Sequence, residues 1–173
     1  MAAPSKLAHV VFRTNRLNAM VDWYCEVLGA KPVFKNDKIA FISYDDEHHR
    51  IAFIAYEPFK EKPAGNHVGF HHVAFTFSDL GELLGNYERL KSRGIAPNRP
   101  ILHGPSCSLY YADPDGNGVE LQIDSYPDMD SARGFMQGEA FSRDPIGTPF
   151  DPEEMLARYR AGVPVEVLAR RHD

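Results

Sequence analysis

Residues 9–12, His-Val-Val-Phe, recur as His-Val-Ala-Phe at residues 72–75, an offset of 63 residues. Both tetrapeptides are rich in β-branched and aromatic residues, which favour strands. Each is followed by apolar residues at helical spacing and then by a glycine that suits a helix end, Gly29 or Gly94. The period exceeds that of solenoid repeats and only two copies occur. The sequence therefore predicts two copies of one strand–helix–strand unit, each with an apolar face to bury against the other.

The first copy contains all the elements of a βαβββ unit. The pattern predicts a strand over residues 7–13 and a helix over 15–28 that Thr14 or Asn15 caps and Gly29 ends. Further strands are expected at three places, residues 31–34, 38–44 and 50–56.

The second copy repeats this order. A strand is expected over residues 71–77, then a helix over 79–93 that begins with a capping box formed by Asp79 and Glu82. Strands follow near residues 108–112 and 119–124. The predicted fold class is α+β, built of paired βαβββ modules.

The chain is expected to divide into a first module at residues 1–64, a second at 65–126 and a C-terminal tail at 127–173. Up to Asp151 the tail reads as irregular sequence. Asp151 and Glu154 then form a second capping box, which predicts a short helix, and residues 164–171 suit another turn or two.

Composition excludes several classes of protein. The 173 residues carry a net charge of −5 and 43% hydrophobic residues, which indicates a folded chain without the basic face typical of nucleic-acid binding. No apolar run is long enough for a membrane span, and no secretory signal is visible. Two cysteines cannot form a disulfide framework, so we expect a cytoplasmic protein. Eight histidines instead indicate chemistry with nitrogen and oxygen ligands.

Strand alternation places three candidate metal ligands on equivalent inner faces. Glu120 lies on the polar face of its strand, His72 shares a face with small residues that leave room for a ligand, and His9 points away from the helix layer. Two imidazoles and one carboxylate form the ligand set of non-haem Fe(II) oxygenases. The alternative is that both histidines are satisfied core residues and Glu120 is a solvated edge charge. Their coincidence at matched repeat positions favours a metal site.

A specific motif runs from residue 101 to residue 120. It reads Ile-Leu-His103, five residues, Leu-Tyr110, two residues, Asp-Pro-Asp-Gly116, three residues and Glu120. This resembles the signature of type I extradiol ring-cleavage dioxygenases, which belong to the vicinal oxygen chelate superfamily. Upstream, the segments around His49 and His72 are similar to other histidine segments of that family. The resemblance covers residues 6–126 and implies an incomplete barrel of paired modules around one metal site.

The resemblance also implies roles for individual residues. It assigns His9, His72 and Glu120 as Fe(II) ligands, with Mn(II) as a possible replacement. It assigns His49 to the oxygen side of the site, His103 to acid/base chemistry beside the ring and Tyr110 to a hydrogen bond with a substrate hydroxyl. The expected partners are a small catechol and O2, without nucleic acid or membrane. The resemblance and the long tail lead us to expect a homo-oligomer.

Several alternatives stay open. His49 could simply cap its turn, and the neighbouring His48 could replace it in the alignment. Another activity of the superfamily is possible, a glyoxalase-like isomerase or a resistance transferase, although the position aligned with Glu120 in the first unit falls at Ile51 and Ala52, which cannot bind a metal. A module that sequesters an aromatic ligand is a third reading. Aromatic tail residues around Phe135 would either cover the site or form an interface.

Overall fold

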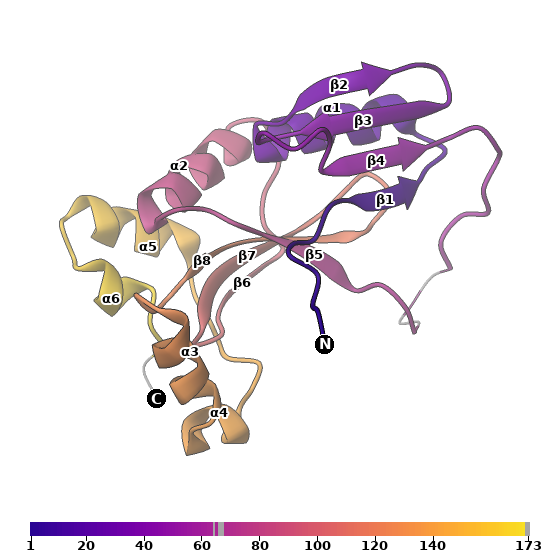
Figure 1. Ribbon diagram of the computed structural model, residues 1–173. Coiled ribbons are helices and arrows are strands. Elements are labelled where there is room, and N and C mark those ends of the chain that lie inside the picture. Colours follow the sequence, from indigo (N-terminus) through magenta and orange to yellow (C-terminus); the bar gives the residue numbers. More distant parts are fainter. Residues whose placement is uncertain (64, 66–67, 172–173) are drawn as a thin grey trace. The chain divides into compact units, whose positions relative to one another are not determined.

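The computed structural model describes residues 1–63, 65 and 68–171 (Figure 1). The chain forms two compact units, which are considered separately. Unit 1 comprises Met1–Phe70 together with the turn Asp113–Asn117, and unit 2 comprises His71–Ala112 and Gly118–Asp173. The boundary expected after residue 64 involves a residue outside the described part of the chain, and it stays a prediction.

Unit 1 contains one helix and a four-stranded sheet with the order β1-β4-β3-β2. Strand β1 pairs in parallel with β4, and the other pairs are antiparallel. The elements are β1 (Val10–Arg13), α1 (Leu17–Leu28), β2 (Lys31–Lys35), β3 (Ile39–Ser43) and β4 (Ile51–Ile54). The βαβββ order predicted for this half is confirmed, although β1 is shorter than expected and begins one residue after His9.

Helix α1 ends where the sequence predicts. Gly29 has a φ of 64°, a left-handed conformation that a residue with a Cβ adopts at a cost. At the other end, Arg16 occupies the capping position without a side-chain cap. Thr14 lies two residues before this position, and its hydroxyl accepts a hydrogen bond from the Arg16 backbone N–H at 2.8 Å. Neither proposed capping residue therefore occupies the cap itself.

The core of unit 1 is aromatic. The Tyr24 ring lies 5.4 Å from the ring centroids of both Phe12 and Phe53. Its hydroxyl donates a 3.1 Å hydrogen bond to Oδ2 of Asp113, a buried carboxylate in the turn that the chain adds to this unit. Burial and the negative charge of Asp113 raise the Tyr24 pKa far above its usual value. The tyrosine therefore acts as a donor that ties the turn to the core.

Unit 2 contains a five-stranded sheet with the order β5-β8-β7-β6-β9. Strands β5 and β8 are parallel, and the remaining pairs are antiparallel. The strands and the first helix are β5 (His72–Thr76), α2 (Leu80–Lys91), β6 (Arg99–Leu102), β7 (Ser106–Ala112), β8 (Gly118–Asp124) and β9 (Thr148–Pro149). The second βαβββ unit is confirmed, with β6 and β9 as strands that the pattern did not predict.

Helix α2 begins with the expected cap. The Asp79 carboxylate accepts from the Glu82 backbone N–H at 2.9 Å, and the Glu82 carboxylate accepts from the Ser78 backbone N–H at 3.1 Å. The helix packs against β8 through its apolar stripe. That stripe consists of the buried residues Leu80, Leu83, Leu84, Tyr87 and Leu90.

The prediction of irregular sequence between residues 127 and 150 is wrong. The structure forms two helices there, α3 (Met129–Met136) and α4 (Glu139–Arg143). Asp128 caps α3 by accepting from the Ser131 backbone N–H at 2.7 Å. The helices predicted further on are present as α5 (Pro152–Arg160), capped by Asp151, and α6 (Val165–Leu168). Within the described residues, no helix combines the length and apolar character that a membrane span requires.

The predicted α+β class is thus confirmed, with two open sheets, each carrying helices. In both units one long helix follows the first strand and covers one face of its sheet (Figure 1).

Candidate active site

Four polar side chains lie close together in unit 2, those of His72, His103, Tyr110 and Glu120. Residues directly opposite one another in adjacent strands lie on the same face of a sheet. Glu120 on β8 is opposite Ala74 on β5 and opposite Tyr110 on β7, and Tyr110 is opposite Arg99 on β6. His72 lies two residues before Ala74 and therefore shares that face. The register explains why His72 and Glu120, 48 positions apart, reach one site.

His72 and Glu120 form the closest pair. Nε2 of His72 lies 2.9 Å from Oε2 of Glu120. Glu120 is 4% exposed, so its carboxylate is buried from solvent, in a site lined by imidazole nitrogens and a hydroxyl. Alanine at position 74 leaves space beside the pair, because no larger side chain stands opposite Glu120 on that strand. Two donor atoms of the kind that bind Fe(II), Mn(II) or Zn(II) thus converge on one point.

His103 and Tyr110 flank this pair. His103 lies in the short connection between β6 and β7, and its Nε2 is 2.9 Å from the Tyr110 hydroxyl and 3.9 Å from Oε1 of Glu120. The His72 and Tyr110 rings meet edge to face with centroids 5.4 Å apart. Burial, followed by the negative charge of Glu120, raises the pKa of Tyr110 to about 12. Tyr110 therefore keeps its proton at neutral pH and can donate a hydrogen bond.

The next residue along β7 faces the other way. Tyr111 is 1% exposed, and its hydroxyl has no hydrogen-bond partner among the described residues. The strand alternation that separates the two tyrosines therefore gives only Tyr110 access to His72, His103 and Glu120.

Unit 1 brings together the other two predicted site residues. The rings of His9 and His49 lie with centroids 4.5 Å apart. On its other side, His49 stacks on Phe41 at 4.7 Å with an interplanar angle of 29°. His48 instead is exposed, with Nε2 3.6 Å from Oε1 of Glu47. The residue that contacts His9 is therefore His49.

The imidazole of His49 lies beside two other imidazoles, those of His9 and His48. Its partial burial, and then the neighbouring His9 and His48 rings, lower its pKa below the ordinary histidine value. A neutral imidazole has a free lone pair, which suits a proton acceptor or a hydrogen-bond acceptor.

The predicted site residues thus form two groups. His72, His103, Tyr110 and Glu120 lie together in unit 2, and His9 with His49 lies in unit 1. Over the described residues, no three or more His, Cys, Asp or Glu side chains are arranged to hold a metal ion. The donor set of unit 2, an imidazole nitrogen facing a buried carboxylate, nevertheless fits a divalent cation chemically.

The first sheet has no carboxylate at the position that Glu120 occupies in the second. The 63-residue offset matches Val11 to Ala74, and Val11 pairs with Ala52 just as Ala74 pairs with Glu120. Ala52 is therefore the counterpart of Glu120, and it has no metal-binding group. A second acidic ligand at the equivalent place, which glyoxalase-type sites need, is absent from this described strand.

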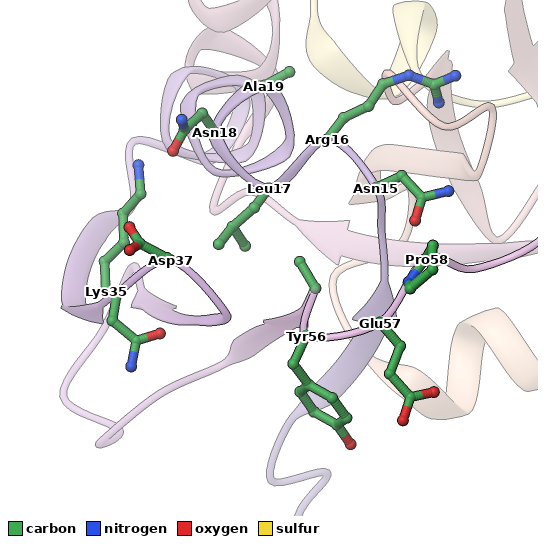
Figure 2. Close-up of a pocket in the computed structure, with 12 residues that line it drawn as sticks. Asn15, Arg16, Leu17, Asn18, Ala19, Lys35, Asp37, Tyr56, Glu57 and Pro58 are labelled. Atoms are coloured by element: carbon green, nitrogen blue, oxygen red, sulfur yellow. The ribbon is translucent and has the colours of Figure 1, made fainter.

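A hollow of about 820 Å³ lies elsewhere in unit 1, at the start of α1 (Figure 2). Lys35 and Asp37 lie beside one another there, while the Arg16 side chain runs away from them. The Arg16 guanidinium is paired with Asp115 and with Glu61. None of the predicted site residues lines this hollow.

Two further contacts of the unit 2 site had no signal in the sequence. The guanidinium carbon of Arg99 lies 4.6 Å from the Tyr110 ring centroid, a cation–π contact. Nδ1 of His103 forms a hydrogen bond with the backbone carbonyl of Ile146 in the tail. The first contact arises because Arg99 on β6 lies opposite Tyr110 on β7. The sequence pattern did not predict β6, because Pro100 lies within it. The second uses a backbone group, which every residue possesses.

Comparison with known proteins places these residues in a family. The model of the glyoxalase/bleomycin resistance protein/dioxygenase superfamily matches residues 6–121. A biphenyl-2,3-diol 1,2-dioxygenase of Rhodococcus globerulus is 47% identical over 96% of this chain and 87% of its own length. A second enzyme of that name and organism is 42% identical over 99% of this chain and 90% of its own length.

The fold has solved counterparts as well. A crystal structure of a lactoylglutathione lyase from Agrobacterium tumefaciens matches 70% of this chain and 96% of its own, with a TM-score of 0.55 and 22% identity. At that identity the likeness concerns the fold alone. The paired βαβββ order, the family match and the near full-length relatives agree, and the chain belongs to the glyoxalase/bleomycin resistance protein/dioxygenase superfamily.

Proposed function

We propose that the chain is a metal-dependent extradiol dioxygenase that opens the ring of a catecholic aromatic next to its two hydroxyl groups. One observation carries the proposal. In a chain 47% identical to a biphenyl-2,3-diol 1,2-dioxygenase, the His72 imidazole faces the buried Glu120 carboxylate, with His103 and Tyr110 beside them. In the overall reaction a ring carbon–carbon bond breaks, and both atoms of O2 enter the product.

The metal ligands under this proposal are His9, His72 and Glu120. Two imidazoles and one carboxylate leave coordination positions open, and this set suits Fe(II) first, with Mn(II) as the alternative. A bound metal would supply Lewis acidity that lowers the pKa of the catechol hydroxyls, together with a route for electrons between the ring and O2. The contact between His9 and His49 supports placing His49 next to a ligand, on the oxygen side of the site.

The remaining residues handle protons and orientation. His103 is the proposed acid/base group, since an imidazole can accept the proton of a catechol hydroxyl and later return it to the product. Tyr110 holds its proton at neutral pH, and its hydroxyl is proposed to form a hydrogen bond with a substrate hydroxyl. Burial of Glu120 and Tyr110 keeps water away from these groups, which strengthens their electrostatic interactions.

The substrate is proposed to be a biaryl diol, because both near full-length relatives are named for biphenyl-2,3-diol. The test is to load the purified chain anaerobically with Fe(II) or Mn(II) in separate samples. Each sample then receives air and 2,3-dihydroxybiphenyl, 3-methylcatechol or catechol, while oxygen uptake and a yellow ring-opened product are followed. We expect the Fe(II) sample to consume O2 fastest with 2,3-dihydroxybiphenyl. Bound iron without oxygen uptake on any diol would contradict the proposal.

We also propose a cytoplasmic homo-oligomer. Cys25 and Cys107 are both free thiols, which suits a reducing compartment. In unit 1, every residue of β2 is exposed, and Val33 and Phe34 are 58% and 49% exposed, which supports coverage by another chain. Sedimentation of the purified chain tests this, and a monomer at all concentrations would contradict it.

A further inference from the structure

His103 is held from two sides within unit 2. Its Nδ1 forms a hydrogen bond with the backbone carbonyl of Ile146, and its Nε2 lies 2.9 Å from the Tyr110 hydroxyl. A carbonyl oxygen only accepts hydrogen bonds, so Nδ1 must carry a proton. In the neutral imidazole, Nε2 is then unprotonated and accepts from the Tyr110 hydroxyl. The contacts thus select one of the two tautomers.

The Ile146 carbonyl is itself fixed by a tight turn, which we name the 144–147 turn. Oδ1 of Asp144 accepts hydrogen bonds from the backbone N–H groups of Ile146 at 3.0 Å and Gly147 at 3.1 Å. Gly147 has a φ of 100°, and a Cβ there would lie 2.1 Å from the carbonyl oxygen of Leu102. The turn therefore packs directly on the end of β6, one residue before His103.

The C-terminal end of the described chain supports this turn. The Arg171 side chain is 6% exposed, and its guanidinium donates to the backbone carbonyl of Asp144 and, at 3.4 Å, to that of Ala140. It also lies 3.7 Å from Oδ2 of Asp144. A buried guanidinium that binds backbone carbonyls fixes the chain in place, because each lost contact would leave a buried charge less satisfied.

We propose that the 144–147 turn, held by Arg171, positions His103 in the Nδ1–H tautomer, so that an unprotonated Nε2 faces Glu120 and Tyr110. Asp144 and Arg171 are positioning residues, since they act through His103. The consequence for catalysis rests on the proposed function: an unprotonated Nε2 can accept a catechol proton, whereas the other tautomer presents an N–H there and cannot. The tautomer itself does not depend on that function.

The direct test is the tautomer of His103 in the full-length protein. Long-range 1H–15N NMR of histidine side chains, at a pH where they are neutral, distinguishes a protonated from an unprotonated ring nitrogen. The His103 signals are assigned by their loss in His103→Gln. We expect a protonated Nδ1 and an unprotonated Nε2 in the wild-type protein. A protonated Nε2 would overturn the proposal, and this measurement needs no folded variant of the turn.

A variant series separates the turn from general damage to the tail. Asp144→Ala removes the acceptor for both backbone N–H groups and should give a mixture of His103 tautomers. Asp144→Asn keeps an acceptor oxygen and should behave as wild type. The matched control is Asp151→Ala, which removes another tail carboxylate that accepts from a backbone N–H, that of Glu153 at 2.8 Å. A wild-type tautomer in Asp144→Ala would show that the turn does not position His103.

Kinetics of the metal-loaded protein then test the consequence. Asp144→Ala should lower kcat about ten-fold and leave KM nearly unchanged, because a misoriented base loses part of the 10²- to 10⁴-fold typical of acid/base catalysis. Asp144→Asn should restore kcat. If no variant and no wild-type sample turns over a catechol, the proposed function fails while the NMR result still decides the tautomer.

Discussion

The imidazole of His72 meets the carboxylate of Glu120 at 2.9 Å, between the first and last strands of one βαβββ unit. These strands are parallel neighbours, so the contact is a product of the topology, which brings the two ends of the repeat side by side. A carboxylate that is 4% exposed needs a cationic or hydrogen-bonding partner to remain charged. A divalent metal shared with His72 would be such a partner.

Replacing Glu120 by Gln tests its role as a ligand. The amide is nearly isosteric but neutral and a poor ligand, so we expect the variant to fold and to lose both bound metal and turnover. Metal content after gel filtration and oxygen uptake are the measurements. Asp124→Asn is the matched control, because Asp124 lies on the same strand and by alternation on the same face, but is exposed. Full metal content in Glu120→Gln would remove Glu120 from the ligand set.

Two adjacent tyrosines give an internally controlled comparison. Tyr110→Phe removes a hydroxyl 2.9 Å from His103 and should lower kcat by about 10- to 100-fold, the range expected when a hydrogen bond to a reacting group is lost. Tyr111→Phe removes a buried hydroxyl that has no partner among the described residues. It should leave kcat unchanged and keep or slightly raise the free energy of unfolding. Equal effects of the two variants on kcat would contradict the assignment of Tyr110.

The hydrogen bond between Tyr24 and Asp113 should stabilise unit 1. Tyr24→Phe deletes the donor but keeps the ring, and we expect the free energy of unfolding to fall by about 1.5–3 kcal/mol, as for a hydrogen bond to a charged group. Urea denaturation measures the change. Tyr56→Phe, at an exposed tyrosine, is the control and should change stability very little. A Tyr24→Phe protein as stable as wild type would show that the bond contributes nothing net.

Two glycines of the α2 region should respond in opposite directions. Gly85 lies inside the helix with nothing within 4 Å of an added Cβ, so Gly85→Ala should raise the free energy of unfolding by about 0.5–1 kcal/mol. Gly94, just after the helix, has a φ of 79°. Gly94→Ala should lower stability by about 1 kcal/mol, because alanine is strained in that conformation. Thermal unfolding of both variants checks the signs, and a stabilised Gly94→Ala would be inconsistent with the left-handed turn.

Much of the fold was predictable because its signals are local. Helices α1 and α2 have apolar residues at helical spacing and a glycine at or just after their ends, and seven of the strands, all but β6 and β9, were expected in nearly the right places. Strand β6 was missed because Pro100 lies within it; it is tolerated there because β9 pairs only with the later residues Ile101 and Leu102. Helix α3 was missed because its short apolar pattern is embedded among Pro, Asp and Gly residues.

The site was predictable only where it follows from strand alternation or from the resemblance to a known family. Alternation placed Glu120 on the polar face of β8, and the repeat matched His9 to His72. The contact of His103 with the Ile146 carbonyl joins residues 43 positions apart through a backbone atom, and no side-chain pattern reports such a contact. The cation–π contact of Arg99 required the register of β6 on β7.

The most direct test of the central claim is isotopic. The Fe(II)-loaded chain is given 2,3-dihydroxybiphenyl under 18O2, the reaction is quenched at once, and the product is examined by mass spectrometry beside a Glu120→Gln sample. We predict a ring-opened product that contains both atoms of one 18O2 molecule, and none from the variant. A product with a single 18O atom, or unchanged substrate from an iron-loaded wild-type protein, would contradict extradiol dioxygenase activity.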